Sequence, residues 1–361
     1  FVRIRFMPDS LLVRADTHVP RRDPFAFYGA ERLERFEVQA VSLRGPAPLR
    51  RGAYLACALE LASRRDADLV FTRDLGVAAA VLRLPRALRP PVVYESHSHA
   101  AVVGAAMGAM LSTGRAASSR KQRRLARRER FVWRAAEGYV TLTGALAAEL
   151  RSSYGARPAL AVVADGARAP EPYAPPARGP LRVAYAGHLY PWKGVDTLVR
   201  ALALTTGITA TIVGGHPGEA DLARVQALAG ELGLLPRVTF TGLVPPGEVA
   251  ALLRSAHALV LPNSATAISS AYTSPLKLFE YLAAGRPIVA SDLPAFREVI
   301  GEQQAVLVPA DDPAAFAGAL CRLRDDEPAR LRMGEAAFAL AAGYTWDARA
   351  TRLEALFQEI A

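Results

Sequence analysis

The chain has 361 residues, 51% of them hydrophobic, with 44 basic and 34 acidic side chains and a formal net charge of +10. This length exceeds what one hydrophobic core usually fills, and the composition excludes disordered and fibrous proteins. The two cysteines lie far apart in the sequence and are expected to be free thiols, which predicts a cytoplasmic enzyme. No apolar run approaches the roughly 20 residues that span a bilayer. The length predicts two domains.

In the first half of the chain, short β-branched runs alternate with helical stretches, which is typical of a parallel sheet wrapped by helices. We expect strands at 2–6, 37–42, 68–72, 92–95, 138–143 and 160–164, and helices at 24–36, 49–65, 74–84, around the basic segment and up to about 153. Residues 165–180 contain five prolines and no periodicity. We therefore take residues 1–170 as an N-terminal domain and residues 171–180 as a linker.

The second half repeats this alternation more regularly. Strands are expected at 181–186, 209–213, 237–241, 258–261, 287–290 and 305–308, with helices at 195–204, 219–232, 246–255, 275–284 and 294–300. This pattern predicts a C-terminal domain at 181–345, and a last helix at 346–361 that is a candidate to pack back on the N-terminal domain. The fold class is therefore α/β, with two doubly wound, Rossmann-like domains facing each other across a cleft lined by strand ends.

Positive charge is concentrated between Arg115 and Arg130, where eight basic residues stand against Glu129 alone. A solvated helix face is one interpretation of this net +7. The other is attraction to anionic lipid headgroups or to an anionic substrate, so the segment is a candidate for peripheral membrane contact. No nucleic-acid-binding signature accompanies the charge, and no nucleic acid partner is expected.

Only three of the basic residues are lysines, and two of them lie in motifs at predicted strand ends. A compact ammonium suits a phosphate oxygen, whereas a guanidinium fork prefers planar bidentate partners. After the strand the chain turns at Gly187 and His188, and Lys193 lies just before the next helix. From this position Lys193 can reach a diphosphate bound at the start of that helix. Chance survival of these lysines is the alternative.

The second lysine, Lys277, opens a predicted helix. Ser274 is expected as its N-cap and Pro275 as its first helical residue, so that the free N–H groups form an anion site. Glu280 has two acceptor oxygens that can hold the two hydroxyls of a ribose. Alternatively, Lys277 and Glu280, three residues apart, form a surface ion pair.

Residues 181–300 resemble the nucleotide-sugar domain of retaining glycosyltransferases of family 4, which have the GT-B fold. The resemblance rests on four motifs in order, namely Gly-His-Leu-Tyr-Pro-Trp-Lys-Gly, Val-Thr-Phe-Thr-Gly-Leu-Val, Leu-Val-Leu-Pro-Asn and Ser-Pro-Leu-Lys-Leu-Phe-Glu-Tyr-Leu-Ala-Ala-Gly. It implies transfer of a sugar from a nucleotide diphosphate sugar, with UDP the expected nucleotide, to an acceptor hydroxyl with retained configuration. It makes Lys193 a diphosphate ligand, Glu280 the ribose ligand and Leu243 a neighbour of the base. Further donor contacts are expected from Gly187, His188, Gly214, Gly215, Tyr272, Ser274, Pro275, Leu276 and Lys277.

Three positions depart from the family pattern. Tyr272 stands where an acidic residue is common, which removes a usual ligand of the donor sugar, and His188 stands where an Arg is common. A histidine can still donate to a phosphate. Met7-Pro8-Asp9-Ser10 replaces the usual Gly-rich loop after the first strand, so acceptor recognition is expected to be particular to this chain.

In the N-terminal half, His97 follows a predicted strand end in Val-Tyr-Glu-Ser-His-Ser-His. The resemblance implies that it lies by the donor sugar, and a structural histidine is the alternative. Because side chains alternate across a strand, we expect only one of Glu95 and His97 to face the cleft.

Metal chemistry is not expected. Asp66-Ala67-Asp68 precedes a strand, at the end away from the predicted cleft, and Lys193 with a helix dipole could neutralise the leaving diphosphate. The rival functions are another GT-B activity, such as a nucleotide-sugar epimerase, and a non-catalytic nucleotide-binding scaffold, which Tyr272 suggests. A dinucleotide-dependent dehydrogenase is disfavoured because no Gly-x-Gly-x-x-Gly follows a predicted strand.

Overall fold

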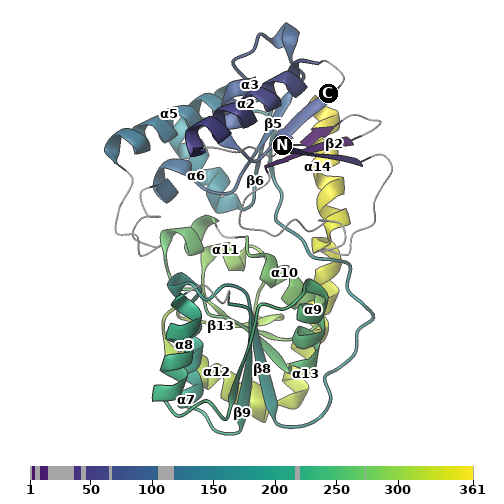
Figure 1. The fold of residues 1–361 in the computed structure, drawn as a ribbon. Helices are drawn as coiled ribbons and strands as arrows, with labels where there is room; N and C mark the ends of the chain where they lie inside the picture. The colour runs from purple at the N-terminus through teal and green to yellow at the C-terminus, as the bar shows by residue number, and fades with distance from the viewer. Residues whose placement is uncertain are drawn as a thin grey trace. The chain divides into compact units, whose positions relative to one another are not determined.

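The computed structural model describes residues 2–4, 9–14, 36–41, 46–64, 67–104, 118–215, 220–272 and 274–360. The chain divides into two compact units, Phe1–Val163 with Thr351–Ala361, and Ala164–Ala350 (Figure 1). Each unit contains a sheet with helices on its faces. In the described part of the chain, no helix is both long and apolar enough to cross a membrane.

The first unit has a seven-stranded sheet of order β3-β2-β1-β4-β5-β6-β7. Its strands are β1 (Val2–Ile4), β2 (Asp9–Arg14), β3 (Phe36–Val41), β4 (Leu69–Thr72), β5 (Val92–Ser96), β6 (Gly138–Thr141) and β7 (Leu160–Val162). Neighbours run parallel except at β1, which is antiparallel to both β2 and β4.

The expectation of an all-parallel sheet is therefore wrong at its first strand. Only four residues separate β1 from β2, and a parallel crossover needs about a dozen or more. The strand β2 was not predicted, and it begins at Asp9 and Ser10, which were expected in a loop. The expected helix at 24–36 lies outside the described residues.

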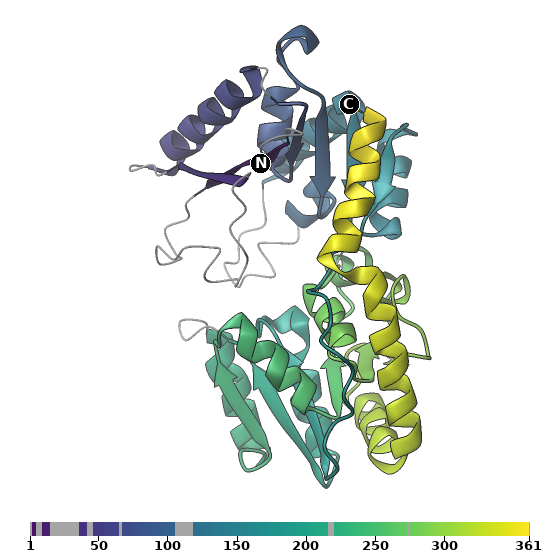
Figure 2. The ribbon, with the colours of Figure 1, turned by 90° about the vertical axis from the view of Figure 1, so that its right-hand side faces the viewer.

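Helices cover both faces of this sheet. On one face, α2 (Ala47–Ser63), α3 (Leu75–Val81) and α5 (Ser119–Ala135) lie side by side (Figure 1). Tyr139 of β6 points to this side, and its ring centroid lies 4.8 Å from that of Trp133 in α5. The opposite face packs against the end of α14 (Trp346–Ile360), where Val93 and Val140 form a core with Leu356 (Figure 2). The period of two along each strand sends these neighbours to opposite sides.

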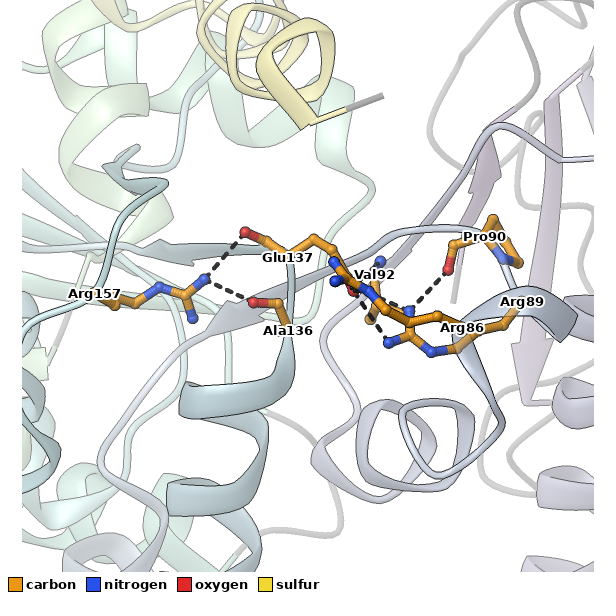
Figure 3. Close-up of polar contacts among 7 residues, drawn as sticks. All are labelled: Arg86, Arg89, Pro90, Val92, Ala136, Glu137 and Arg157. Carbon is orange, nitrogen blue, oxygen red and sulfur yellow. Dashed lines mark hydrogen bonds and ion pairs between the residues drawn. The ribbon is translucent and has the colours of Figure 1, made fainter.

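A partly buried carboxylate, that of Glu137, ties together the starts of β5 and β6 (Figure 3). The Glu137 carboxylate accepts hydrogen bonds from Arg86 at 3.1 Å, from Arg89 at 3.0 and 3.1 Å, and from the Val92 amide at 2.9 Å. Arg157 donates to the carbonyls of Ala136 and Glu137 at 2.9 and 3.3 Å. Burial raises the pKa of Glu137, but the bonds from Arg89 and Val92 outweigh it, and the pKa lies below its usual value. These arginines have structural partners.

The second unit has a six-stranded, fully parallel sheet of order β10-β9-β8-β11-β12-β13. Its strands are β8 (Leu181–Ala186), β9 (Ile208–Val213), β10 (Val238–Gly242), β11 (Ala258–Leu261), β12 (Ile288–Ser291) and β13 (Ala305–Val308). Its helices are α7 (Val195–Ala203), α8 (Ala220–Glu231), α9 (Pro246–Ser255), α10 (Leu276–Ala283), α11 (Pro294–Arg297), α12 (Pro313–Asp325) and α13 (Glu327–Ala341). The predicted doubly wound pattern is confirmed here.

Two apolar cores, one on each face of the sheet, hold this unit together. Along β8, Val183 and Tyr185 belong to the core formed with α7, α8 and α12, while Ala184 and Ala186 belong to the core formed with α9, α10 and α13. The segment proposed as a linker runs along this unit, where Tyr173 packs on Phe338 with ring centroids 5.4 Å apart.

Candidate active site

The order of the second sheet places a topological switch point between two neighbouring strands, β8 and β11. After β8 the chain passes to α7 on one face, and after β11 it passes to α10 on the other. In open α/β sheets, ligands bind outside the carboxyl ends of the strands at such a switch point. Lys193 and Lys277, the two lysines noted in the sequence, lie on these two connections.

Lys277 points inward from α10 rather than into solvent. It is only 8% exposed, and its Nζ lies 4.0 Å from the ring centroid of Tyr185 and donates to the Tyr185 hydroxyl at 2.7 Å. That hydroxyl in turn donates to the His188 carbonyl at 2.6 Å. Burial, and then the positive charge of Lys193, hold the pKa of Lys277 well below its usual value, while Glu280 opposes this effect.

Lys193 ends a 3-10 turn, Pro191–Lys193, that is fixed against the loop after β11. Gly194 has φ of +68°, and a Cβ there would lie 1.7 Å from the Pro262 carbonyl oxygen, so this approach requires glycine. The Ser264 amide also donates to the Trp192 carbonyl at 3.1 Å. Burial lowers the pKa of Lys193. Within the described residues its ammonium has no hydrogen-bond or ion-pair partner.

Three glycines lie near this switch point, in backbone conformations or close approaches that leave no room for a side chain. Gly187 has φ of +135°, and a Cβ on it would lie 3.2 Å from the Lys277 Nζ. Gly214, with φ of +113°, lies so close that its Cβ would be 2.4 Å from the Gly187 carbonyl oxygen, and Gly215 has φ of +87°. Backbone can therefore approach a ligand beside the two ammonium groups.

The start of α10 differs from the expected cap. The helix begins at Leu276, with Pro275 at the N-cap position and no side-chain cap. Ser274 was expected to cap it, but its hydroxyl instead accepts a hydrogen bond from the Asp165 amide at 3.0 Å. The first N–H groups of a helix still lack intrahelical partners, so this end keeps its attraction for an anion.

Glu280 does not pair with Lys277 as the alternative interpretation required. Lys277 turns to Tyr185, while Glu280 is exposed on α10. Although part of the side chain is exposed, burial of the carboxyl raises its pKa, and the charge of Lys277 partly offsets this. Its carboxylate is thus open to a ligand.

The remaining predicted residues of the second unit differ in exposure. Leu243, directly after β10, is 68% exposed, which is unusual for a leucine that serves only the core. Tyr272 ends a π-helical segment, Ile268–Tyr272, and is 4% exposed. His188 is exposed and stacks on Tyr190, with centroids 4.9 Å apart.

In the first unit, the premise that strand alternation separates Glu95 from His97 is wrong, while the expectation that only one of them faces the cleft stays a prediction. The two residues are two positions apart, so strand alternation puts them on the same face. The His97 Nε2 lies 2.6 Å from the Glu95 Oε1, and Arg73 at the end of β4 approaches the same carboxylate at 3.8 Å. Glu95 is 1% exposed, so a buried carboxylate holds the imidazole.

Sequence reasoning missed two residues beside the lysines. Tyr185 is fully buried and holds Lys277, but nothing in its strand pattern separates it from an ordinary core tyrosine. Asn263 follows β11 next to Gly194, is completely buried, and has no hydrogen-bond partner for either side-chain polar atom in the described part of the chain. Its position at a strand end beside the lysine motif was the available signal.

No group of three or more His, Cys, Asp or Glu side chains in the described ranges is arranged to hold a metal ion. The expectation that no metal takes part stays a prediction, as does the expected cleft between the two units.

Comparison with known proteins identifies the family. Residues 180–326 match the family described as "Glycosyl transferases group 1", and residues 10–166 match the "Glycosyl transferase 4-like domain". The chain belongs to the group 1, family 4 glycosyltransferases, as its motifs predicted, and its two α/β units are those of the GT-B fold.

Relatives and solved structures agree with this assignment. The chain is 32% identical over 185 residues to the D-inositol 3-phosphate glycosyltransferase of Corynebacterium efficiens, spanning 49% of this chain and 42% of that protein. It is 31% identical over 282 residues to the enzyme of the same name from Acidothermus cellulolyticus, spanning 71% of this chain and 59% of that one. The chain thus spans about half the length of these curated relatives.

Two solved structures share the fold. Sucrose-phosphate synthase of Thermosynechococcus elongatus superposes with a TM-score of 0.75 at 19% identity, over 97% of this chain and 88% of that one. HepE of Anabaena, solved in complex with UDP, has a TM-score of 0.70 at 18% identity, over 90% and 86%.

Proposed function

We propose that this chain is a retaining glycosyltransferase that moves a sugar from a nucleotide diphosphate sugar to an acceptor hydroxyl. The observation that carries the proposal is the pair of partly desolvated ammonium groups, Lys193 and Lys277, at the switch point of the second sheet. Their pKa values are lowered because charge is buried there. A bound diphosphate would supply the negative charge that these two ammonium groups lack as a counterion. The lysines would stabilise the diphosphate more strongly in the transition state, when further negative charge develops on it, than in the ground state.

In this proposal the second unit binds the donor. Lys193, Lys277 and the N-terminal amides of α10 hold the diphosphate, and Glu280 accepts hydrogen bonds from the ribose. Leu243 contacts the base, and Gly187, Gly214 and Gly215 allow close approach. UDP is the proposed nucleotide, a choice supported by the structure of HepE with UDP-glucose.

The proposed chemistry leaves the sugar configuration unchanged. The bond between the anomeric carbon and the phosphate oxygen breaks, and the acceptor oxygen bonds to that carbon from the same face. The acceptor proton passes to the departing phosphate oxygen. The lysines stabilise that leaving group, so no metal ion is required.

The first unit is proposed to bind the acceptor and to bring His97 to the donor sugar. The contact between Glu95 and His97 supports this role, because a buried carboxylate fixes the ring orientation. An acceptor that is anionic or lipid-linked is proposed, and the phosphorylated substrate in the relatives' name supports the anionic form.

We propose that the protein is cytoplasmic and contacts the inner membrane face through the basic segment Arg115–Arg130, of which residues 118–130 are described. Each Lys or Arg near an anionic membrane contributes about 1 kcal/mol, and salt screens this attraction. Cosedimentation with anionic and neutral vesicles across a salt series tests it. Equal and salt-insensitive partitioning would contradict it.

Thermal stabilisation by a panel of nucleoside diphosphates tests donor binding directly. A ligand at 100 times its dissociation constant adds about 2.7 kcal/mol to the free energy of unfolding. UDP should raise the melting temperature, and Lys193→Ala should make the rise smaller at the same UDP concentration. No stabilisation by any nucleoside diphosphate would refute the donor site.

A non-catalytic nucleotide-binding scaffold is the second candidate. It is favoured by the buried Tyr272, at a position where a family carboxylate commonly contacts the donor sugar. A scaffold would bind nucleotide and release no product from a nucleotide sugar. Donor turnover therefore separates the two functions.

A further inference from the structure

Helix α5 carries five of its seven arginines along one side. Arg120, Arg123, Arg124, Arg127 and Arg128 are spaced i, i+3, i+4, i+7 and i+8. This is the spacing at which an amphipathic helix normally places its apolar stripe. The buried residues of the helix are Glu129, Val132 and Trp133, which face the unit instead. The helix therefore presents a continuous guanidinium surface.

A sixth arginine from a neighbouring element converts this surface into a pocket. Arg83 follows α3, which lies beside α5 (Figure 1). The six arginines line a cavity of about 580 Å³, which we call the arginine pocket. The Arg83 guanidinium is held in place over the Phe131 ring, 4.8 Å from its centroid, and by a hydrogen bond to the Ala79 carbonyl. The pocket is thus partly preorganised.

The five α5 arginines of the pocket have no carboxylate partner within the described residues. Asp74, whose charge acts on Arg128, is already held by Arg51 through two hydrogen bonds of 2.6 Å. The arginines around Glu137 are, by contrast, all bound to protein oxygens (Figure 3). The five α5 arginines of the pocket therefore have no such structural role.

Gathering these charges works against folding. Like charges three and four residues apart destabilise a helix. Burial, followed by the charges of Arg124, Arg51 and Arg83, lowers the pKa of Arg128. A bound polyanion would relieve this repulsion, and guanidinium forks match phosphate oxygens bidentately.

We propose that the arginine pocket is a binding site for a ligand that bears two or more phosphoryl groups, either free or on a lipid headgroup. The pocket is formed by residues of the first unit, whereas the proposed donor site is formed by residues of the second. This inference rests on the proposed contact of the basic segment with an anionic partner. It assigns that contact to a defined pocket in place of a diffuse electrostatic attraction.

The test compares two double variants that each remove two positive charges from exposed positions of α5. The pocket variant is Arg124→Gln with Arg127→Gln, and the control variant is Lys121→Gln with Arg134→Gln, which lie outside the pocket. Each protein is titrated calorimetrically with tripolyphosphate, and each titration is repeated with Lys193→Ala added, which weakens the proposed donor site equally in all three proteins. Equal melting temperatures of the three proteins establish that all are folded.

We expect the wild type to bind tripolyphosphate saturably. The dissociation constant of the pocket variant should be at least tenfold higher, because charge-assisted bonds to phosphate are lost in the pocket. That of the control variant should lie within twofold of the wild type. Cosedimentation with phosphatidylcholine vesicles containing diacylglycerol pyrophosphate, a lipid with two phosphoryl groups, distinguishes the sources. Vesicle binding that only the pocket variant loses, without tripolyphosphate binding, assigns the phosphoryl groups to a lipid. Equal losses of binding in both variants would indicate a diffuse membrane contact and would overturn the pocket. An absence of binding to both probes would overturn it as well.

Discussion

Replacing Lys277 by methionine should separate stability from ligand binding. In the free protein the substitution removes the 2.7 Å hydrogen bond from Nζ to the Tyr185 hydroxyl, a loss of about 0.5 to 1.5 kcal/mol. Tyr185 keeps its bond to the His188 carbonyl at 2.6 Å. The substitution also removes a buried ammonium whose lowered pKa reports an unfavourable charge beside Lys193. These effects oppose each other, so the free energy of unfolding should change by less than about 1 kcal/mol.

The nucleotide complex should respond differently. A charge-assisted bond from Lys277 to a phosphate contributes about 1.5 to 3 kcal/mol, which corresponds to a roughly 10- to 150-fold weaker dissociation constant for UDP. Calorimetric titration and thermal unfolding of the same preparation measure both quantities. Lys121→Met, on the exposed side of α5, is the control and should alter neither. A UDP affinity within twofold of the wild type would refute the role of Lys277.

Four further results are expected. Lys193→Ala should weaken UDP binding by a similar 10- to 150-fold factor and slow transfer, with only partial rescue by Lys193→Arg; wild-type activity would remove Lys193 from the mechanism. Glu280→Gln should weaken nucleotide binding and leave the melting temperature nearly unchanged, since the carboxylate is exposed; the reverse pattern would give it a structural role. Gly194→Ala should destabilise the fold by more than about 2 kcal/mol in denaturant titrations, because φ is +68° and the Pro262 carbonyl occupies the space, whereas Gly247→Ala, with open space around it, should not. Because Lys277 has a lowered pKa that a diphosphate would raise, UDP binding should take up protons and weaken as the pH rises above the free-protein pKa; calorimetry in buffers of different ionisation enthalpy checks the sign, and proton release would contradict it.

The sequence was sufficient to predict the second unit because its strands are short apolar runs separated by helices with clear turns. The family assignment followed from motifs at those strand ends, and it is confirmed. Lys193 and Lys277 could be singled out because each follows a strand that flanks the switch point. Their roles in binding stay predictions.

Other features depend on contacts between distant residues. Tyr185 and Lys277 are 92 positions apart, so their hydrogen bond has no local signal. Ser274 has the composition of a cap, but its hydroxyl is taken by the amide of Asp165 from another part of the chain. The antiparallel β1 and the strand β2 were not predicted, because the rest of the sheet is parallel. The connection between β1 and β2 is too short for a parallel crossover, so these two strands pair antiparallel.

The Glu95–His97 pair was within reach of sequence reasoning and was misjudged. Residues two apart on a strand share a face, so their contact follows from the spacing alone. Only part of the arginine pocket could be predicted from the sequence. The spacing of the arginines on α5 is a local pattern, whereas Arg83 comes from a different element.

Proton NMR of UDP-glucose incubated with the full chain, with and without hydroxyl acceptors that include D-inositol 3-phosphate, tests the central claim most directly. The account predicts release of UDP and a new sugar product that first appears as the α-anomer, with both signals lost in Lys277→Met. Bound UDP without turnover of any nucleotide sugar, a β-configured product, or an epimerised nucleotide sugar would contradict it.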